Sequence, residues 1–158
     1  MTTQVTIRSM GAGGDGVANL PDGQLFVPFT LPGEVANVAR DKNRATVMAL
    51  LETSAERQDP ACQHFEDCGG CALQHWQDEP YRAWKRELVV SALKGRGLDV
   101  EVDELVACQP PSRRPASFAA SKTEKAVLPG LYSHHNTAMI DIVVSSIIVP
   151  GIMSRSVA

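Results

Sequence analysis

The stretch GVANLPDGQLFVPFTLPGE, residues 16–34, alternates short apolar runs with turn residues and decides the fold. The PDG turn at 21–23 separates two apolar runs, and the LPGE turn at 31–34 follows at a similar spacing. Working outward, a further alternating run lies upstream, and VANVAR and RATVMALLE flank a DKN turn at 41–43 downstream. Five short strands between residues 4 and 53 predict a small, closed or nearly closed β-barrel of the oligonucleotide-binding (OB) type.

The periodicity changes from strand to helix after residue 57. Apolar side chains recur at helical spacing from Tyr81 to Ala92, with Asp78 expected to cap the helix and Gly95 to end it. Downstream, short strands are predicted at 102–107, 116–120, 125–133 and 139–149. We therefore expect a mainly β protein with one clear helix (α+β). Its predicted domains are a barrel, 1–57, and a second region, 58–158, that contains a cysteine loop, the helix and a small β-sheet.

Composition and charge predict a globular protein. The chain has 158 residues, of which 44% are apolar, and its formal charge of −3 is spread without a long basic tract. The N-terminus lacks the charged and apolar regions of an export signal. The longest apolar run, 138–152, contains Asp141 and Pro150 and is too short for a membrane helix. These features predict a protein of the reducing cytoplasm.

The motif GAGGDG, Gly11 to Gly16, formally matches a dinucleotide-binding fingerprint. That fingerprint needs a helix that opens at its last glycine, so that backbone amides meet a phosphate. Here a proline and another glycine follow within a few residues, which leaves no room for a helix. We therefore interpret the motif as a turn and expect no nucleotide or S-adenosylmethionine pocket in this chain.

Three of the four cysteines, Cys62, Cys68 and Cys71, lie within ten residues in a C-x5-C-x2-C pattern. The glycines between the last two allow a tight backbone that directs several thiols at one compact object. One interpretation is a 4Fe-4S cluster, which needs a fourth ligand. Another is a zinc ion completed by His64 or His75. A redox pair of Cys68 and Cys71 is a third, although no thioredoxin-like context surrounds it.

A family resemblance rests on four segments: GGDGVA, FVPFTLPGE, ERQDPACQHFEDCGGCALQHW and EPYRAWKRELVVSAL. Together they resemble the N-terminal half of bacterial RNA uracil-5-methyltransferases that use S-adenosylmethionine and modify 23S rRNA or tRNA. The resemblance implies that the barrel is a TRAM domain that binds RNA. It also implies that Cys62, Cys68 and Cys71 are three ligands of a 4Fe-4S cluster.

The chain departs from the family's pattern in two places. Ser145 stands where the family has its fourth cysteine, and Cys108 lies in an unrelated segment. The family's catalytic domain, with its methyl-donor loop, nucleophilic cysteine and general base, has no counterpart before the final residues GIMSRSVA. We therefore expect the chain alone to be inactive, and we name no catalytic residue. A separate catalytic subunit and self-association through the C-terminal strand are the protein partners that these features predict.

The predicted RNA contacts are Arg8, Arg40, Lys42 and Arg44, which supply local positive charge on the barrel. Phe26 and Phe29 are candidate stacking platforms, although core packing is the commoner role of such side chains. The function predicted from these features is an RNA-binding, cluster-bearing part of an RNA (uracil-5-)-methyltransferase. The alternative is a zinc-stabilised RNA-binding or interaction module without an enzymatic role.

Overall fold

The computed structural model describes residues 2–122, 127–134, 138–142 and 145–153, and it divides into two compact units. Unit 1 comprises Met1–Asp59 and His75–Leu105, and unit 2 comprises Pro60–Gln74 and Val106–Ala158. The helix thus groups with the N-terminal strands, whereas the sequence analysis placed it in the second region. The domain boundary after residue 57 stays a prediction.

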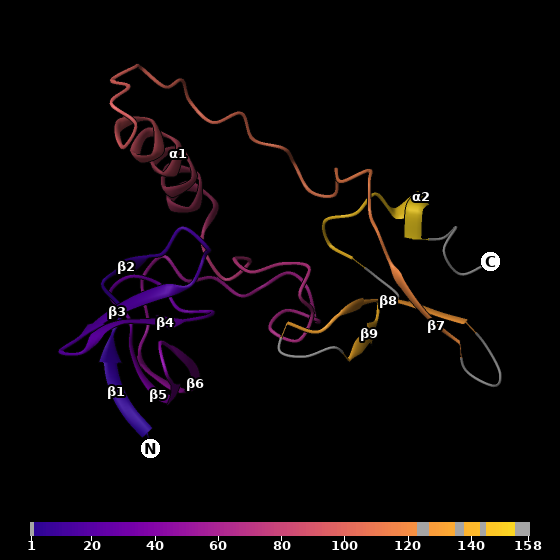
Figure 1. Cartoon of the computed structure of the whole chain (residues 1–158). Helices are drawn as coiled ribbons and strands as arrows, with labels where there is room; N and C mark the ends of the chain where they lie inside the picture. Colours follow the sequence, from indigo (N-terminus) through magenta and orange to yellow (C-terminus); the bar gives the residue numbers. More distant parts are fainter. Residues whose placement is uncertain (1, 123–126, 135–137, 143–144, 154–158) are drawn as a thin grey trace. The chain divides into compact units, whose positions relative to one another are not determined.

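Unit 1 is built on a six-stranded sheet (Figure 1). Its strands are β1 (Thr2–Thr6), β2 (Ser9–Met10), β3 (Gly16–Leu20), β4 (Gly23–Val27), β5 (Val35–Asp41) and β6 (Arg44–Glu52). They pair in the order β1-β5-β6-β4-β3-β2, so the two outer strands are successive stretches of one chain segment. The sheet therefore curls on itself, and the expected mainly β, OB-like fold is confirmed.

The sheet has six strands rather than the expected five because the first stretch changes its partner midway. The backbone N–H of Ile7 donates to the Glu34 carbonyl at 2.9 Å, next to β5. The N–H of Arg8 donates instead to the Val17 carbonyl at 2.8 Å, on β3. One bent stretch thus supplies both β1 and β2.

The interior of the curled sheet holds a single cluster of buried apolar side chains. Its members come from every strand except the two-residue β2, and from the bend between β1 and β2: Val5, Ile7, Ala18, Leu25, Val27, Ala36, Val38 and Ala45. Burying each of the larger side chains stabilises the fold by about 1.5–3 kcal/mol. The alternation of these positions with exposed ones is the pattern that predicted the strands.

The glycine motif is a turn, as the sequence analysis inferred. The N–H of Gly14 donates to the Gly11 carbonyl at 2.9 Å, and β3 begins directly at Gly16. A Cβ atom at Gly16 would lie 2.9 Å from Cγ2 of Ile7 and would also clash with the Thr30 hydroxyl. Gly16 therefore serves close packing inside the barrel.

The one long helix, α1 (Asp78–Lys94), begins one residue earlier than a cap at Asp78 would require. The N-cap is Gln77, whose side-chain amide donates to the Ala55 carbonyl at 2.9 Å. Asp78 is instead the first helical residue and pairs with Arg82 one turn later. Gly95 ends the helix as predicted, with its N–H bonded to the Ser91 carbonyl at 2.9 Å.

The start of α1 is fixed by aromatic packing. Trp76 is almost fully buried, and the rings of Tyr81 and Trp84 lie 6.3 and 5.6 Å from it between centroids. The Trp76 indole N–H donates to a Glu56 carboxylate oxygen at 2.8 Å. Short backbone pairing between residues 56–58 and 75–77 closes the base of the intervening cysteine loop.

Unit 2 contains a three-stranded antiparallel sheet (Figure 1). Its strands are β7 (Ala119–Lys122), β8 (Val127–Tyr132) and β9 (Met139–Asp141), and the short helix α2 (Pro150–Met153) follows. Within the described ranges, neither helix has the length and apolar character of a membrane span.

Two strand predictions for the second half were wrong. Residues 102–107 form no strand: Arg86 donates to the carbonyls of Val102 and Asp103, and Val106 is 91% exposed. The strand expected at 139–149 ends at Asp141, and Ile148 makes only an isolated bridge to Arg113. Part of that expected strand, residues 143–144, lies outside the described residues.

Candidate metal centre

Cys62, Cys68 and Cys71 lie on a tightly turned loop of unit 2. The N–H of Phe65 donates to the Cys62 carbonyl at 3.1 Å, and the N–H of Cys68 donates to the His64 carbonyl at 2.9 Å. These two turns bring the first two cysteines back toward each other. The loop thus folds locally through its own backbone bonds.

The loop is also fastened to the end of β8. The N–H of Gly69 donates to the Tyr132 carbonyl at 2.9 Å, and the N–H of His134 donates to the Asp67 carbonyl at 2.9 Å. A Cβ atom at Gly69 would lie 3.1 Å from the Tyr132 oxygen, so a glycine suits this close approach. The N–H of Gly70 points at the Cys68 sulfur at 3.4 Å.

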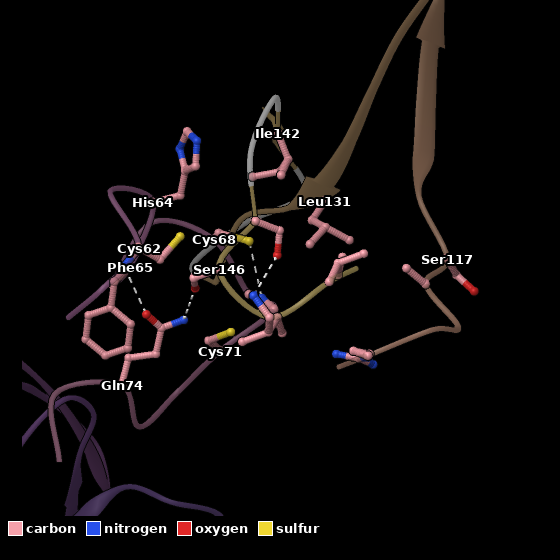
Figure 2. A pocket seen from close by; sticks show the side chains of 17 residues that line it. Cys62, His64, Phe65, Cys68, Cys71, Gln74, Ser117, Leu131, Ile142 and Ser146 are labelled. Carbon is pink, nitrogen blue, oxygen red and sulfur yellow. Dashed lines mark hydrogen bonds between the residues drawn. The ribbon is translucent and has the colours of Figure 1, made fainter. Parts of the chain in front are cut away.

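The three cysteines line one cavity of about 220 Å³ (Figure 2). Ser145, from the segment that follows β9, lines the same cavity. Much of the remaining wall is apolar and includes Leu131 and Ile142. Cys68 is buried, whereas Cys62 and Cys71 are partly exposed. The structure therefore brings three thiols and the Ser145 hydroxyl to one cavity.

Gln74 connects the two segments that form this cavity, as Figure 2 shows. Its side-chain oxygen accepts the N–H of Cys62 at 3.1 Å, and its side-chain nitrogen donates to the Ser146 hydroxyl at 3.4 Å. No role was predicted for Gln74 from the sequence. The one available signal was its place in the LQHW portion of the cysteine segment.

The environment of Cys71 disfavours a free thiolate. Burial raises the pKa of the Cys71 thiol, and the neighbouring Cys62 and Cys68 raise it further. A hydrogen bond with Gln74 and the charge of Arg113 oppose this shift without reversing it. A metal ion would supply the positive charge that a thiolate at this position needs.

The three thiols line the same cavity, but they are not placed as a preformed site for one metal ion. Across the described part of the chain, no group of three or more histidine, cysteine, aspartate or glutamate side chains is placed to hold a single metal ion. His64 lines the cavity, whereas His75 does not. Cys108 is exposed and is not a lining residue either.

The predicted RNA-binding residues divide into two places. Arg40, Lys42 and Arg44 lie together on the hairpin between β5 and β6, whereas Arg8 lies on the bend between β1 and β2. Arg40 and Arg44 form ion pairs at 2.7 Å with Asp22 and Asp15, respectively. Carboxylates therefore already neutralise part of this positive surface.

The two candidate stacking residues differ in their surroundings. Phe26 pairs with Arg44 between β4 and β6, so it lies beside the basic hairpin. Phe29 packs edge-on against His75, and its carbonyl accepts a bond from Arg57 at 2.8 Å. Phe26 therefore remains the better placed of the two for contact with a base.

Comparison with known proteins identifies relatives over nearly the whole chain. No protein-family model matches it. An uncharacterized RNA methyltransferase of Brucella suis is 74% identical over 154 residues, which make up 98% of this chain and 37% of that protein. A second, of Agrobacterium fabrum, is 53% identical over 98% of this chain and 39% of its own length.

A more distant relative carries a more specific name. A 23S rRNA (uracil(1939)-C(5))-methyltransferase of Marinomonas posidonica is 29% identical over 90% of this chain and 34% of its own length. The chain thus spans between 34% and 39% of the length of these three proteins. By its sequence, the chain is homologous over nearly its whole length to about a third of each of these bacterial RNA methyltransferases.

Proposed function

We propose that this chain is the RNA-binding, iron–sulfur part of an RNA (uracil-5-)-methyltransferase that acts in the base methylation of rRNA or tRNA in the cytoplasm. One observation carries the proposal: Cys62, Cys68 and Cys71 line a single cavity together with Ser145. S-adenosylmethionine is the methyl donor that the family resemblance implies for the longer relatives. We assign it no pocket among the described residues, because the Gly11 to Gly16 turn runs directly into β3.

Two features support a 4Fe-4S cluster in this cavity. All three thiols line one cavity of about 220 Å³, which leaves room for a polyatomic cluster. The Gly70 N–H directed at the Cys68 sulfur is the kind of hydrogen bond that tunes iron–sulfur clusters. The three thiolates would each hold one iron. Bound there, the cluster would supply redox-active iron and would link the cysteine loop to the segment that carries Ser145.

The fourth iron would have a weaker ligand than the other three. Ser145 is the side chain in the cavity wall that stands in the place of the family's fourth cysteine, and its hydroxyl accepts the Ile147 N–H at 3.4 Å. A hydroxyl binds iron less well than a thiolate does. We therefore expect an oxygen-labile cluster that loses one corner first.

Zinc is the second candidate, and the position of His64 in the cavity wall favours it. Cys62, Cys68, Cys71 and His64 would form a Cys3His set after the loop tightened around a single ion. The protein would then be a zinc-stabilised RNA-binding or interaction module. His75, the other histidine that the sequence offered for this set, is not among the lining residues.

We place the RNA-binding surface on the barrel hairpin that carries Arg40, Lys42 and Arg44, with Phe26 beside it. Basic groups of this kind follow a phosphate backbone, and an adjacent ring can stack on a base. Arg8, on the bend between β1 and β2, is the fourth proposed contact. The ion pairs of Arg40 and Arg44 must be given up to phosphate, so we expect weak binding.

Alanine variants of the four cysteines test the metal site one ligand at a time. After anaerobic purification, C62A, C68A and C71A should each lose most of the bound iron and sulfide. C108A is the matched control, because Cys108 is exposed and is not a lining residue, and it should keep both. Equal iron content in all four variants would contradict the assignment of the ligands.

A further inference from the structure

The cavity wall holds an uneven distribution of charge. Among its described lining residues, Arg113 is the only lysine or arginine, and no aspartate or glutamate lines it. The same wall carries three thiols that lose their protons when they bind a metal. A basic residue therefore lines the cavity in which negative charge would accumulate.

The backbone holds Arg113 at this place. Its N–H donates to the Ile147 carbonyl at 3.0 Å, and its own carbonyl accepts the Val149 N–H at 3.1 Å. These bonds fix Arg113 against the segment that also carries Ser145 and Ser146, two further lining residues. Main-chain bonds thus hold Arg113 in place, and a substitution of its side chain leaves these bonds intact.

We propose that Arg113 is the charge-compensating residue of the metal centre and stabilises its more reduced state. This inference rests on the proposed cluster. A dicationic cubane core held by three thiolates is a monoanion, and the gain of one electron makes it a dianion. A nearby cation stabilises the dianion more than the monoanion and so raises the reduction potential. No bond forms or breaks in this step, and the electron comes from the added chemical reductant.

Arg114 provides a matched comparison on the next residue. It is exposed, carries the same charge and does not line the cavity. The contrast between the two neighbours therefore separates a specific effect at the cavity from a general effect of net charge.

Anaerobic reductive titration with dithionite and redox mediators tests the inference. R113Q should shift the midpoint potential of the cluster to more negative values, R113E should shift it further, and R113K should restore most of the original value. R114Q should leave the potential unchanged. The R113Q shift should shrink as salt is raised, because Arg113 is exposed and its field is screened. A purely structural role would not be rescued by lysine in this way.

The possible outcomes distinguish the inference from the function on which it rests. If the unmodified protein contains iron and sulfide but R113Q and R114Q have the same potential, the inference is wrong and the cluster stands. If the unmodified protein contains no iron, both are wrong. Loss of the cluster in R113Q together with its retention in R113K and R114Q also supports the inference, since charge at this residue is then needed for the cluster itself.

Discussion

Arg57 binds the buried carboxylate of Glu34 through two nitrogens, with Nε 2.6 Å from Oε1 and Nη2 2.8 Å from Oε2. The same carboxylate accepts the backbone N–H groups of Leu31 at 2.8 Å and of Ser54 at 3.2 Å. Glu34 thus joins a barrel turn to the chain that leaves the barrel. Arg57 also forms an antiparallel backbone bridge with Trp76 at the base of the cysteine loop. The ion pair with Glu34 therefore holds a residue of that base.

Replacing Glu34 by glutamine should destabilise unit 1 strongly. The substitution keeps the volume of the side chain but removes the charge that Arg57 needs, and breaking a buried ion pair costs about 3 kcal/mol or more. Urea unfolding followed by tryptophan fluorescence would measure the loss. The control is D22N, which removes the carboxylate of an exposed ion pair and should leave the free energy of unfolding nearly unchanged. Equal stability of E34Q and the unmodified protein would contradict this role.

The stability of unit 1 should fall in mild acid because of His75. Burial and the nearby Arg57 charge lower the pKa of His75 from 6.5 to about 4. Between these values the unfolded chain binds a proton that the folded chain does not. The free energy of unfolding should therefore decrease as the pH falls from 6.5 to 4, by up to about 3 kcal/mol.

Glutamine at position 75 should remove this dependence above pH 4.5, whereas the control H64Q should keep it. Below pH 4.5, Glu34 causes a second loss of stability. Burial opposes the ionisation of its carboxyl group, but hydrogen bonds from Arg57 and two backbone amides hold the pKa of Glu34 below its ordinary value of 4.5. Its stabilising effect is therefore present at neutral pH and disappears as the pH falls through that lowered pKa. An unfolding free energy that stays level from pH 6.5 to 4 in the unmodified protein would contradict the His75 argument.

The local patterns of the sequence predicted those parts of the fold that local patterns can specify. Period-two alternation and turn residues predicted the barrel strands, and helical spacing predicted α1 almost to its ends. The split of the first stretch into β1 and β2 depends on a change of partner at Ile7 and Arg8, which no local pattern shows. The strand predicted at 102–107 failed because the carbonyls of Val102 and Asp103 bind Arg86, and no described strand pairs with this stretch.

Some residues of the candidate site were likewise predicted from the sequence, and others were not. The cysteine spacing identified three thiols, and the family resemblance suggested the place of Ser145, which lies in the wall of the same cavity. Gln74 and Arg113 were not predicted, because their roles depend on contacts between segments that are distant in the sequence. Gln74 bonds to Ser146, and Arg113 bonds to Ile147 and Val149. The proposed ligands and RNA contacts stay predictions until they are measured.

The basic hairpin should dominate binding to single-stranded RNA. Replacing Arg40, Lys42 and Arg44 together by alanine removes at most three phosphate contacts, so the slope of log affinity against log salt should fall by about 2. Fluorescence anisotropy with a labelled single-stranded oligonucleotide at several salt concentrations would measure both affinity and slope. Alanine at Arg82, Lys85 and Lys94 on α1 is the control with the same change in net charge. Equal losses in the two triple variants would show that the hairpin is not the specific contact.

Cysteine at position 145 should strengthen the metal centre. S145C places a fourth thiol in the wall of the cavity that already holds three, and a thiolate binds iron more strongly than a hydroxyl does. Iron and sulfide content should rise, and bleaching of the visible absorption in air should slow. The control S117C adds a thiol at another lining residue and should give a smaller gain. Identical bleaching rates for S145C and the unmodified protein would place Ser145 away from the metal.

The most direct test of the proposed metal centre is quantification of iron, acid-labile sulfide and zinc in the unmodified protein after anaerobic purification. The account predicts about three to four irons with a similar amount of sulfide per chain, broad visible absorption that bleaches in air, and little zinc. One zinc per chain without sulfide would contradict the iron–sulfur assignment and favour the zinc-stabilised module instead.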